Sequence, residues 1–124
     1  MCRLNTQHVR GRRIYKHKPV LAYKVMRWDP VSSSFESLYF RAAQVRYSLG
    51  RRYRAEGVRT YSLEGFHAYK YLADARRIAR RCPWKILRVA LYGRVISHWG
   101  KKSVWKADGY RAEYMRLLKV VGKR

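Results

Sequence analysis

Histidine and carboxylate side chains, which carry most acid–base and metal chemistry, are sparse in this sequence of 124 residues. There are seven Asp and Glu and four His, whereas a two-metal nuclease site needs several carboxylates that converge on hard cations. Glu113 stands out because it lies among hydrophobic and aromatic residues, where it is either an ion-pair partner of an arginine or a catalytic carboxylate. His67 has an apolar neighbour on each side and precedes an expected helix. We interpret it as a hydrogen-bonded structural residue, with phosphate binding near the helix N-terminus as the alternative.

Cysteine usage predicts neither a disulfide framework nor a zinc site. Cys2 lies near the N-terminus and Cys82 on the apolar side of the expected helix, and Cys2, His8 and His17 are spaced too irregularly for a zinc finger. The patterns G-x-x-x-x-G-K-[ST], G-x-G-x-x-G and G-x-S-x-G are absent from the sequence, so phosphate-loop enzymes and hydrolase elbows have no support. We therefore expect no metal and no cofactor, and the sequence favours a protein that is not an enzyme.

Positive charge is the dominant feature of the composition. The chain has 30 Lys and Arg against seven Asp and Glu, a formal net charge of +23. Like charges confined to one small domain repel each other and destabilise the compact state. A polyanion relieves this repulsion, and nucleic acid also supplies affinity through the release of counterions from its phosphates. The alternatives are a basic protein that merely stays soluble and one that binds an acidic protein surface.

The basic residues are spread in clusters along the chain and are interleaved with 11 Tyr and four Trp. Arginine suits bidentate phosphate contacts, and aromatic rings stack on unpaired bases. The candidate nucleic-acid-binding residues are Arg10, Arg12, Arg13, Lys16, Lys18, Arg51, Arg52, Arg54, Arg76, Arg77, Arg80, Arg81, Trp99, Lys101, Lys102, Trp105 and Lys106. Because no helix-turn-helix or finger is visible for the major groove, RNA or a ribonucleoprotein is favoured over duplex DNA.

The length predicts one domain, and a content of 48% hydrophobic residues argues against disorder throughout. We expect a flexible basic arm over 1–18 and a single domain over 19–124. No apolar stretch is long enough for a membrane span, and the basic N-terminus has no apolar signal region. These features predict a cytoplasmic protein with no membrane contact.

One helix and several strands are expected within 19–124. The helix is predicted over Tyr71–Cys82, where Leu72, Ala75, Ile78, Ala79 and Cys82 share one side and Arg76, Arg77, Arg80 and Arg81 the other. A strand is predicted over residues 20–26, a short one over 35–40 and a long one over Trp84–Ser97, in which Gly93 indicates a bulge or a close backbone approach.

Two segments are ambiguous between helix and strand. Residues 41–56 have a partial helical stripe, but Gly50 favours strand, turn and strand. Residues 110–121 fit either period, and we prefer a strand. The expected fold class is therefore α+β, with mostly antiparallel strands packed around one main amphipathic helix at about 71–82.

Several short boxes resemble a group of small uncharacterised phage and bacterial proteins. The resemblance is carried by Val45–Tyr53 with its glycine turn, by the G-[FI]-H-A box at Gly65–Ala68, by Leu91–Val95 and by the G-Y-R-A box at Gly109–Ala112. It covers residues 19–121 loosely. It implies a compact α+β fold with the last box on a strand, and it implies no activity.

The order of elements is also similar, more distantly, to ADP-ribosyltransferase-like domains. In those domains an early strand supplies Arg or His, a middle strand leads into a helix and a late strand supplies Glu. The resemblance implies that His67 and Tyr69 lie in the middle segment and that Glu113 is the catalytic acid. The first strand departs from that pattern, because Ala22–Tyr23–Lys24 contains neither Arg nor His.

These observations lead to one hypothesis and one alternative. The hypothesis is a nucleic-acid-binding protein of phage or mobile-element type, of which an inhibitor or component of a host nucleoprotein such as a CRISPR effector is a specific form. The alternative is an ADP-ribosyltransferase-like enzyme.

Overall fold

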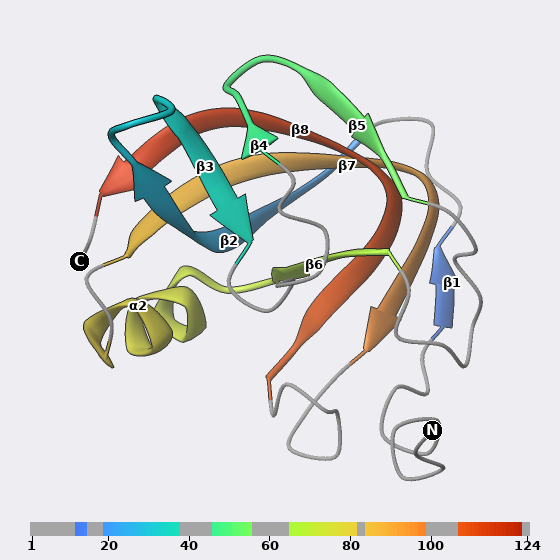
Figure 1. Ribbon diagram of the computed structural model, residues 1–124. Helices are drawn as coiled ribbons and strands as arrows, with labels where there is room; N and C mark the ends of the chain where they lie inside the picture. Colours follow the sequence, from blue (N-terminus) through green and yellow to red (C-terminus); the bar gives the residue numbers. More distant parts are fainter. Residues whose placement is uncertain are drawn as a thin grey trace, which may run out of the picture.

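The computed structural model describes residues 12–14, 19–37, 46–55, 65–81, 84–98 and 107–122 (Figure 1). Within these ranges the chain forms one sheet and a helix. The elements are β1 (Arg12–Ile14), β2 (Val20–Asp29), β3 (Ser34–Ser37), β4 (Arg46–Tyr47), β5 (Arg52–Arg54), β6 (Phe66–Tyr69), α2 (Leu72–Arg81), β7 (Lys85–His98) and β8 (Gly109–Gly122).

The long strands β7 and β8 organise the sheet. They pair with each other from Ile86 and Gly122 to His98 and Gly109. On its other edge β7 pairs with β2 in its first half and with β1 in its second half, while β8 pairs with β5 and then β6. A further pairing between Tyr23 and Tyr69 joins β2 to β6. The pairings β2–β7–β8–β6–β2 therefore form a closed circuit, and β3 and β4 extend the sheet from β2.

A bulge at Gly93 bends the β7–β8 pair. Tyr92 lies opposite Tyr114 and Val95 opposite Ala112, so Gly93 and the residue after it oppose a single residue of β8. Gly93 has a φ of 73°, a conformation that glycine adopts without steric cost. Of the two alternatives predicted at Gly93, a bulge or a close backbone approach, the structure shows the bulge.

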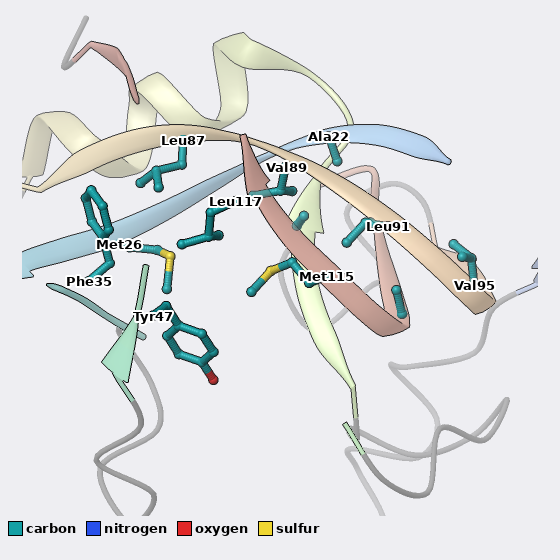
Figure 2. Packing of buried hydrophobic residues seen from close by; sticks show 12 residues of the cluster. Ala22, Met26, Phe35, Tyr47, Leu87, Val89, Leu91, Val95, Met115 and Leu117 are labelled. Carbon is teal, nitrogen blue, oxygen red and sulfur yellow. The ribbon is translucent and has the colours of Figure 1, made fainter. Parts of the chain in front are cut away.

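The larger core lies between the long strands and β3 and β4. Because successive side chains of a strand point to opposite faces, Leu87, Val89 and Leu91 project to the same side of β7. They meet Met115 and Leu117 of β8 in a cluster that Figure 2 shows from close by. The buried members of this cluster are Ala22, Met26, Phe35, Tyr47, Ala68, Leu87, Val89, Leu91, Val95, Ala112, Met115 and Leu117.

Helix α2 covers one end of the opposite face of the sheet. Ala75 and Ala79 of the helix are buried against Val25 of β2 and Ile86 of β7. Partly buried apolar side chains complete this smaller cluster, namely Tyr23, Tyr69, Leu72, Ile78 and Trp84. The two clusters therefore lie on opposite faces of the same strands, with α2 on the side away from β3 and β4 (Figure 1).

The expected α+β class is wrong, because the described chain is mostly antiparallel sheet. The ten residues of α2 contribute two small, fully buried side chains, Ala75 and Ala79, to a satellite cluster. The large side chains of the main core come from strands. The strands pack on one another, and the helix is an attachment to one face rather than the centre of the fold.

Several local expectations are confirmed. The helix predicted over 71–82 forms over Leu72–Arg81, with Leu72, Ala75, Ile78 and Ala79 packed inward and Arg76, Arg77 and Arg80 exposed, while Cys82 lies outside the described residues. The long strand predicted over 84–97 is β7, the one over 20–26 is part of β2, and 110–121 is a strand. Strand, turn and strand surround Gly50, whose φ is 80°.

Parts of the other expected segments are described. Of the strand predicted over 35–40, residues 35–37 lie in β3, and 38–40 lie outside the described residues. Within the predicted arm, Arg12–Ile14 pair with β7, and 1–11 and 15–18 lie outside. Among the described residues, no helix is long and apolar enough to cross a membrane.

We expect Gly93→Ala to destabilise the protein more than Gly50→Ala. Both glycines have positive φ, so an alanine costs about 1–2 kcal/mol of backbone strain at either position. A Cβ at Gly93 would also lie 2.7 Å from Glu113 Oε1 and 2.8 Å from Tyr114 Cδ2, whereas one at Gly50 meets nothing within 4 Å. This overlap adds roughly 1–3 kcal/mol. Urea unfolding of the parent and both variants measures the free energy of unfolding. An equal loss of this free energy in the two variants would contradict the tight packing at the bulge.

Candidate nucleic-acid interface

One face of the sheet beside α2 carries arginine and tyrosine side chains. Arg88, Ala90 and Tyr92 of β7 point away from the main core, because the residues between them are core residues. Cross-strand partners share a face, and the register places Arg116 beside Ala90 and Tyr114 beside Tyr92. We call this surface the arginine–tyrosine face, formed by Tyr23, Arg52, Arg54, Arg88, Tyr92, Tyr114 and Arg116.

The arginines of this face stack on its tyrosines. The guanidinium carbon of Arg52 lies 5.1 Å from the ring centre of Tyr114 and 6.0 Å from that of Tyr92. Arg54 lies 5.8 Å from the Tyr114 ring, and Arg88 lies 4.6 Å from the Tyr23 ring. Cation–π contacts at these distances are favourable without neutralising the charge. The rings therefore hold the guanidinium groups close to the sheet while the groups keep their positive charge.

Carboxylates are concentrated elsewhere. Asp29 and Glu36 pair with Arg27 and Arg46 at the β2–β3 end of the sheet. Ser32 and the amide of Val31 also donate to Asp29, and these hydrogen bonds lower the pKa of its carboxyl group. On the arginine–tyrosine face, Glu113 lies 3.6 Å from Arg54.

Most arginines of the face therefore have no compensating charge. In the described part of the chain, no carboxylate oxygen lies within 4 Å of the guanidinium nitrogens of Arg52, Arg88 or Arg116. Arg52 and Arg116 are exposed and lie directly opposite each other on β5 and β8. Two like charges in adjacent cross-strand positions repel, so this pair is an attractive site for an anion.

The outward arginines of α2 extend the same side of the molecule. Because the apolar side of the helix packs on the face that carries Arg88 and Arg116, its opposite side points to solvent beside them. Arg76 and Arg80 are exposed, and Arg77 pairs with Asp74 at 3.3 Å. The helix and the arginine–tyrosine face thus form neighbouring cationic regions on one side of the sheet.

The structure places some of the predicted binding residues together. Arg52 and Arg54 lie on the arginine–tyrosine face, and Arg51 precedes them with its guanidinium 6.0 Å from the Tyr53 ring. Arg12 and Arg13 belong to β1 at a different edge, and Arg81 ends α2. The remaining candidates lie outside the described residues, namely Arg10, Lys16, Lys18, Trp99, Lys101, Lys102, Trp105 and Lys106.

Sequence reasoning missed Arg88 and Arg116 as binding candidates, together with the tyrosines that flank them. Alternation along Trp84–Ser97 already put Arg88 and Tyr92 on the polar side of a strand. That signal could have identified these two residues. Arg116 and Tyr114 could not be added without the register, because their segment fitted helix and strand equally well.

The three residues of the transferase-like alternative lie on adjacent strands. On β6, His67 is opposite Arg111 and Tyr69 is opposite Gly109, and Glu113 lies two residues beyond Arg111 on β8. The Glu113 carboxylate accepts a hydrogen bond from the Arg94 amide at 3.3 Å, in addition to its contact with Arg54. Glu113 thus holds the bulge in β7 and fits the role of an ion-pair partner.

Two basic side chains are displaced from their ordinary titration range by burial. Lys24 donates from Nζ to the backbone oxygen of His67 at 2.6 Å, and burial lowers its pKa to about 8. Burial and the adjacent positive charge of Arg111 lower the pKa of His98 to about 4. His98 and Arg111 are almost completely buried. His98 and Arg111 therefore lie inside the fold rather than on the cationic surface.

No group of three or more His, Cys, Asp and Glu side chains that could hold a metal ion occurs in the described ranges. Comparison of the chain with protein-family models, with curated proteins and with solved structures finds no match.

We expect stability to fall with decreasing pH through His98. Its pKa is about 4 in the folded protein and 6.5 in its ordinary state, so between these values the unfolded chain binds a proton that the folded chain does not. Linkage then removes about 2 kcal/mol of the free energy of unfolding between pH 7 and pH 5. Urea unfolding of the parent and of His98→Gln at both pH values measures this loss. An equal pH dependence in the two proteins would contradict the buried neutral state of His98.

Proposed function

We propose that the protein binds nucleic acid through the arginine–tyrosine face and the neighbouring arginines of α2. The observation that carries the proposal is the pairing of Arg52 with Arg116 beside Tyr114, without a carboxylate within 4 Å of either guanidinium group in the described chain. Such a site lacks negative charge and offers two forked donors close together. Phosphate oxygens supply the missing charge in a geometry that guanidinium groups recognise.

The presence of tyrosines favours nucleic acid over a simple anion. Tyr92 and Tyr114 are half-buried and lie directly opposite each other, so parts of both rings remain available beside the arginines. Bases that are not paired stack on aromatic rings and guanidinium planes. A surface that offers both phosphate donors and rings therefore suits single-stranded or structured RNA better than duplex DNA, whose bases are already stacked.

The sequence also led to hypotheses more specific than nucleic-acid binding, and these stay predictions. An origin in a phage or mobile element, action on a host nucleoprotein such as a CRISPR effector and a cytoplasmic location are expectations from the sequence. An acidic protein surface would also neutralise the charge of the arginines, but its carboxylates would not stack on the tyrosine rings. The transferase-like alternative involves Glu113, whose carboxylate is engaged at the β7 bulge and with Arg54.

The double substitution R52Q/R116Q tests the proposed face. Loss of two phosphate contacts should weaken the binding of a labelled single-stranded RNA roughly tenfold or more. It should also reduce the steepness of the log–log salt dependence by about 0.7 for each contact. Fluorescence anisotropy over a range of salt concentrations measures both quantities.

R27Q/R46Q is the matched control, because it removes the same charge from arginines that are paired with Glu36 and Asp29. It should change the salt dependence less than R52Q/R116Q does. Equal effects of the two double variants would show that net charge alone governs affinity. Absence of any salt-dependent binding by the parent protein would overturn the proposal.

A second substitution, R76Q/R80Q, tests the contribution of the helix. Both arginines are exposed and no carboxylate contacts them in the described chain, so their replacement leaves the packing of α2 intact. We expect weaker binding to all RNA sequences by a similar factor, because phosphate contacts carry no sequence information. Unchanged affinity would mean that this side of α2 is a solvated surface outside the interface.

A further inference from the structure

An apolar pocket opens on the side of the main core opposite α2. Its volume is about 440 Å³, within the range of about 300–1,000 Å³ typical of ligand sites. Its lining combines the apolar side chains of Trp28, Phe35, Leu49 and Val120 with the polar residues Ser33, Ser48 and Lys85. It lies where the β2–β3 hairpin, the turn before β5 and the last part of β8 come together (Figure 1).

Aromatic rings form one wall of this pocket. Trp28 and Phe35 are directly opposite each other on β2 and β3, with ring centres 4.8 Å apart and planes inclined at 58°. Phe35 is buried, whereas 37% of Trp28 remains exposed. The tryptophan is therefore held by the phenylalanine and still accessible from the pocket. A planar, apolar group is the kind of ligand that such a wall accepts by stacking.

The polar lining is suited to an anion. Among the described residues that line the pocket, Lys85 carries a charge and none is a carboxylate. Asp29 and Glu36 follow the pocket residues Trp28 and Phe35 in the sequence. Asp29 accepts a hydrogen bond from Ser32 and pairs with Arg46, and Glu36 pairs with Arg27 and Arg46. A ligand that combines a flat apolar ring with a negative group therefore fits the lining better than a purely aliphatic side chain.

The pocket and the arginine–tyrosine face lie on opposite faces of the sheet, and residues 49–52 run along the edge of β8 between them. Leu49 lines the pocket and pairs with Leu117, and the amide of Gly50 donates to the Leu117 oxygen at 2.6 Å. Arg51 and Arg52 follow immediately in the chain, and Arg52 reaches Arg116 on the opposite side of the sheet edge. Two residues, Gly50 and Arg51, thus connect Leu49 in the wall of the pocket to Arg52 in the proposed phosphate site.

We infer that this pocket binds one unpaired nucleobase of a single-stranded nucleic acid. The base stacks on Trp28, its own phosphate approaches Lys85, and the neighbouring phosphates pass over Arg51 around the β5 edge of the sheet to Arg52 and Arg116 on the other face. This inference rests on the proposed function, because it assigns the same ligand a second point of contact. It adds that recognition requires an unpaired base as well as phosphates.

The test compares a short labelled phosphodiester chain that is entirely abasic with the same chain carrying a single adenine, in ribose and in deoxyribose form. Stacking of one base on an aromatic residue contributes about 1–3 kcal/mol, so the parent should bind the adenine-bearing chain roughly 5- to 150-fold more tightly. Trp28→Leu should remove this preference and leave the salt dependence unchanged, whereas Trp28→Phe should retain part of it.

Tyr71→Leu is the matched control, since Tyr71 is an exposed aromatic residue outside the pocket. It should retain the full preference for adenine. Ribose and deoxyribose chains that behave alike would assign recognition to the base, and a stronger ribose preference would add a contact to the 2′-hydroxyl group. Both results support the inference.

Three outcomes would overturn it. Equal binding of both chains with a steep salt dependence would leave the proposed function intact and remove the base site. No salt-dependent binding of either chain would remove both proposals. An unchanged preference for adenine in Trp28→Leu would remove the base site from this pocket, and a dimer of the parent in light scattering that Trp28→Leu loses would assign the pocket to contact with a second copy of the chain.

Discussion

Strands β7 and β8 pair along almost their whole length, and four other strands bind to one or the other of them. The bulge at Gly93 bends this pair, so that β8 pairs with β6 before the bend and with β5 after it. Glu113 holds the bend through the Arg94 amide, and its own backbone oxygen accepts from the Ala55 amide at 2.7 Å. The same pairing thus shapes the core and fixes the edge on which Arg52 and Arg54 lie.

The shortage of carboxylates explains where positive charge accumulates. The carboxylates that form ion pairs in the described chain lie in the β2–β3 hairpin, in the first turn of α2 and at the β7 bulge. At these points a carboxylate organises a turn or a helix end. On the open sheet beside α2, Arg52 and Arg88 contact tyrosines rather than acids, while Arg54 also pairs with Glu113. Repulsion within this surface destabilises the free protein and is relieved when an anion binds.

The site could be predicted in part. Arg51, Arg52 and Arg54 are visible as a cluster because they are close in sequence, and Arg76 and Arg80 because helical spacing puts them on one side. Arg88 and Arg116 lie 28 positions apart in the chain and join the cluster through the β7–β8 and β5–β8 registers. The pocket is still harder to predict from the sequence, because Trp28, Leu49 and Val120 come from three separate segments.

Local backbone preferences were already determined by the sequence. Helical spacing with a proline after Cys82 predicts α2, alternation predicts β7, and Gly50 and Gly93 mark the turn and the bulge, because these features depend on neighbouring residues alone. The fold class was decided by tertiary structure. Residues 110–121 fit two periods, and pairing with β7 selects the strand since it satisfies their backbone groups and buries Met115 and Leu117. Which arginines and tyrosines share a surface was likewise decided by register, a long-range property that no local pattern encodes.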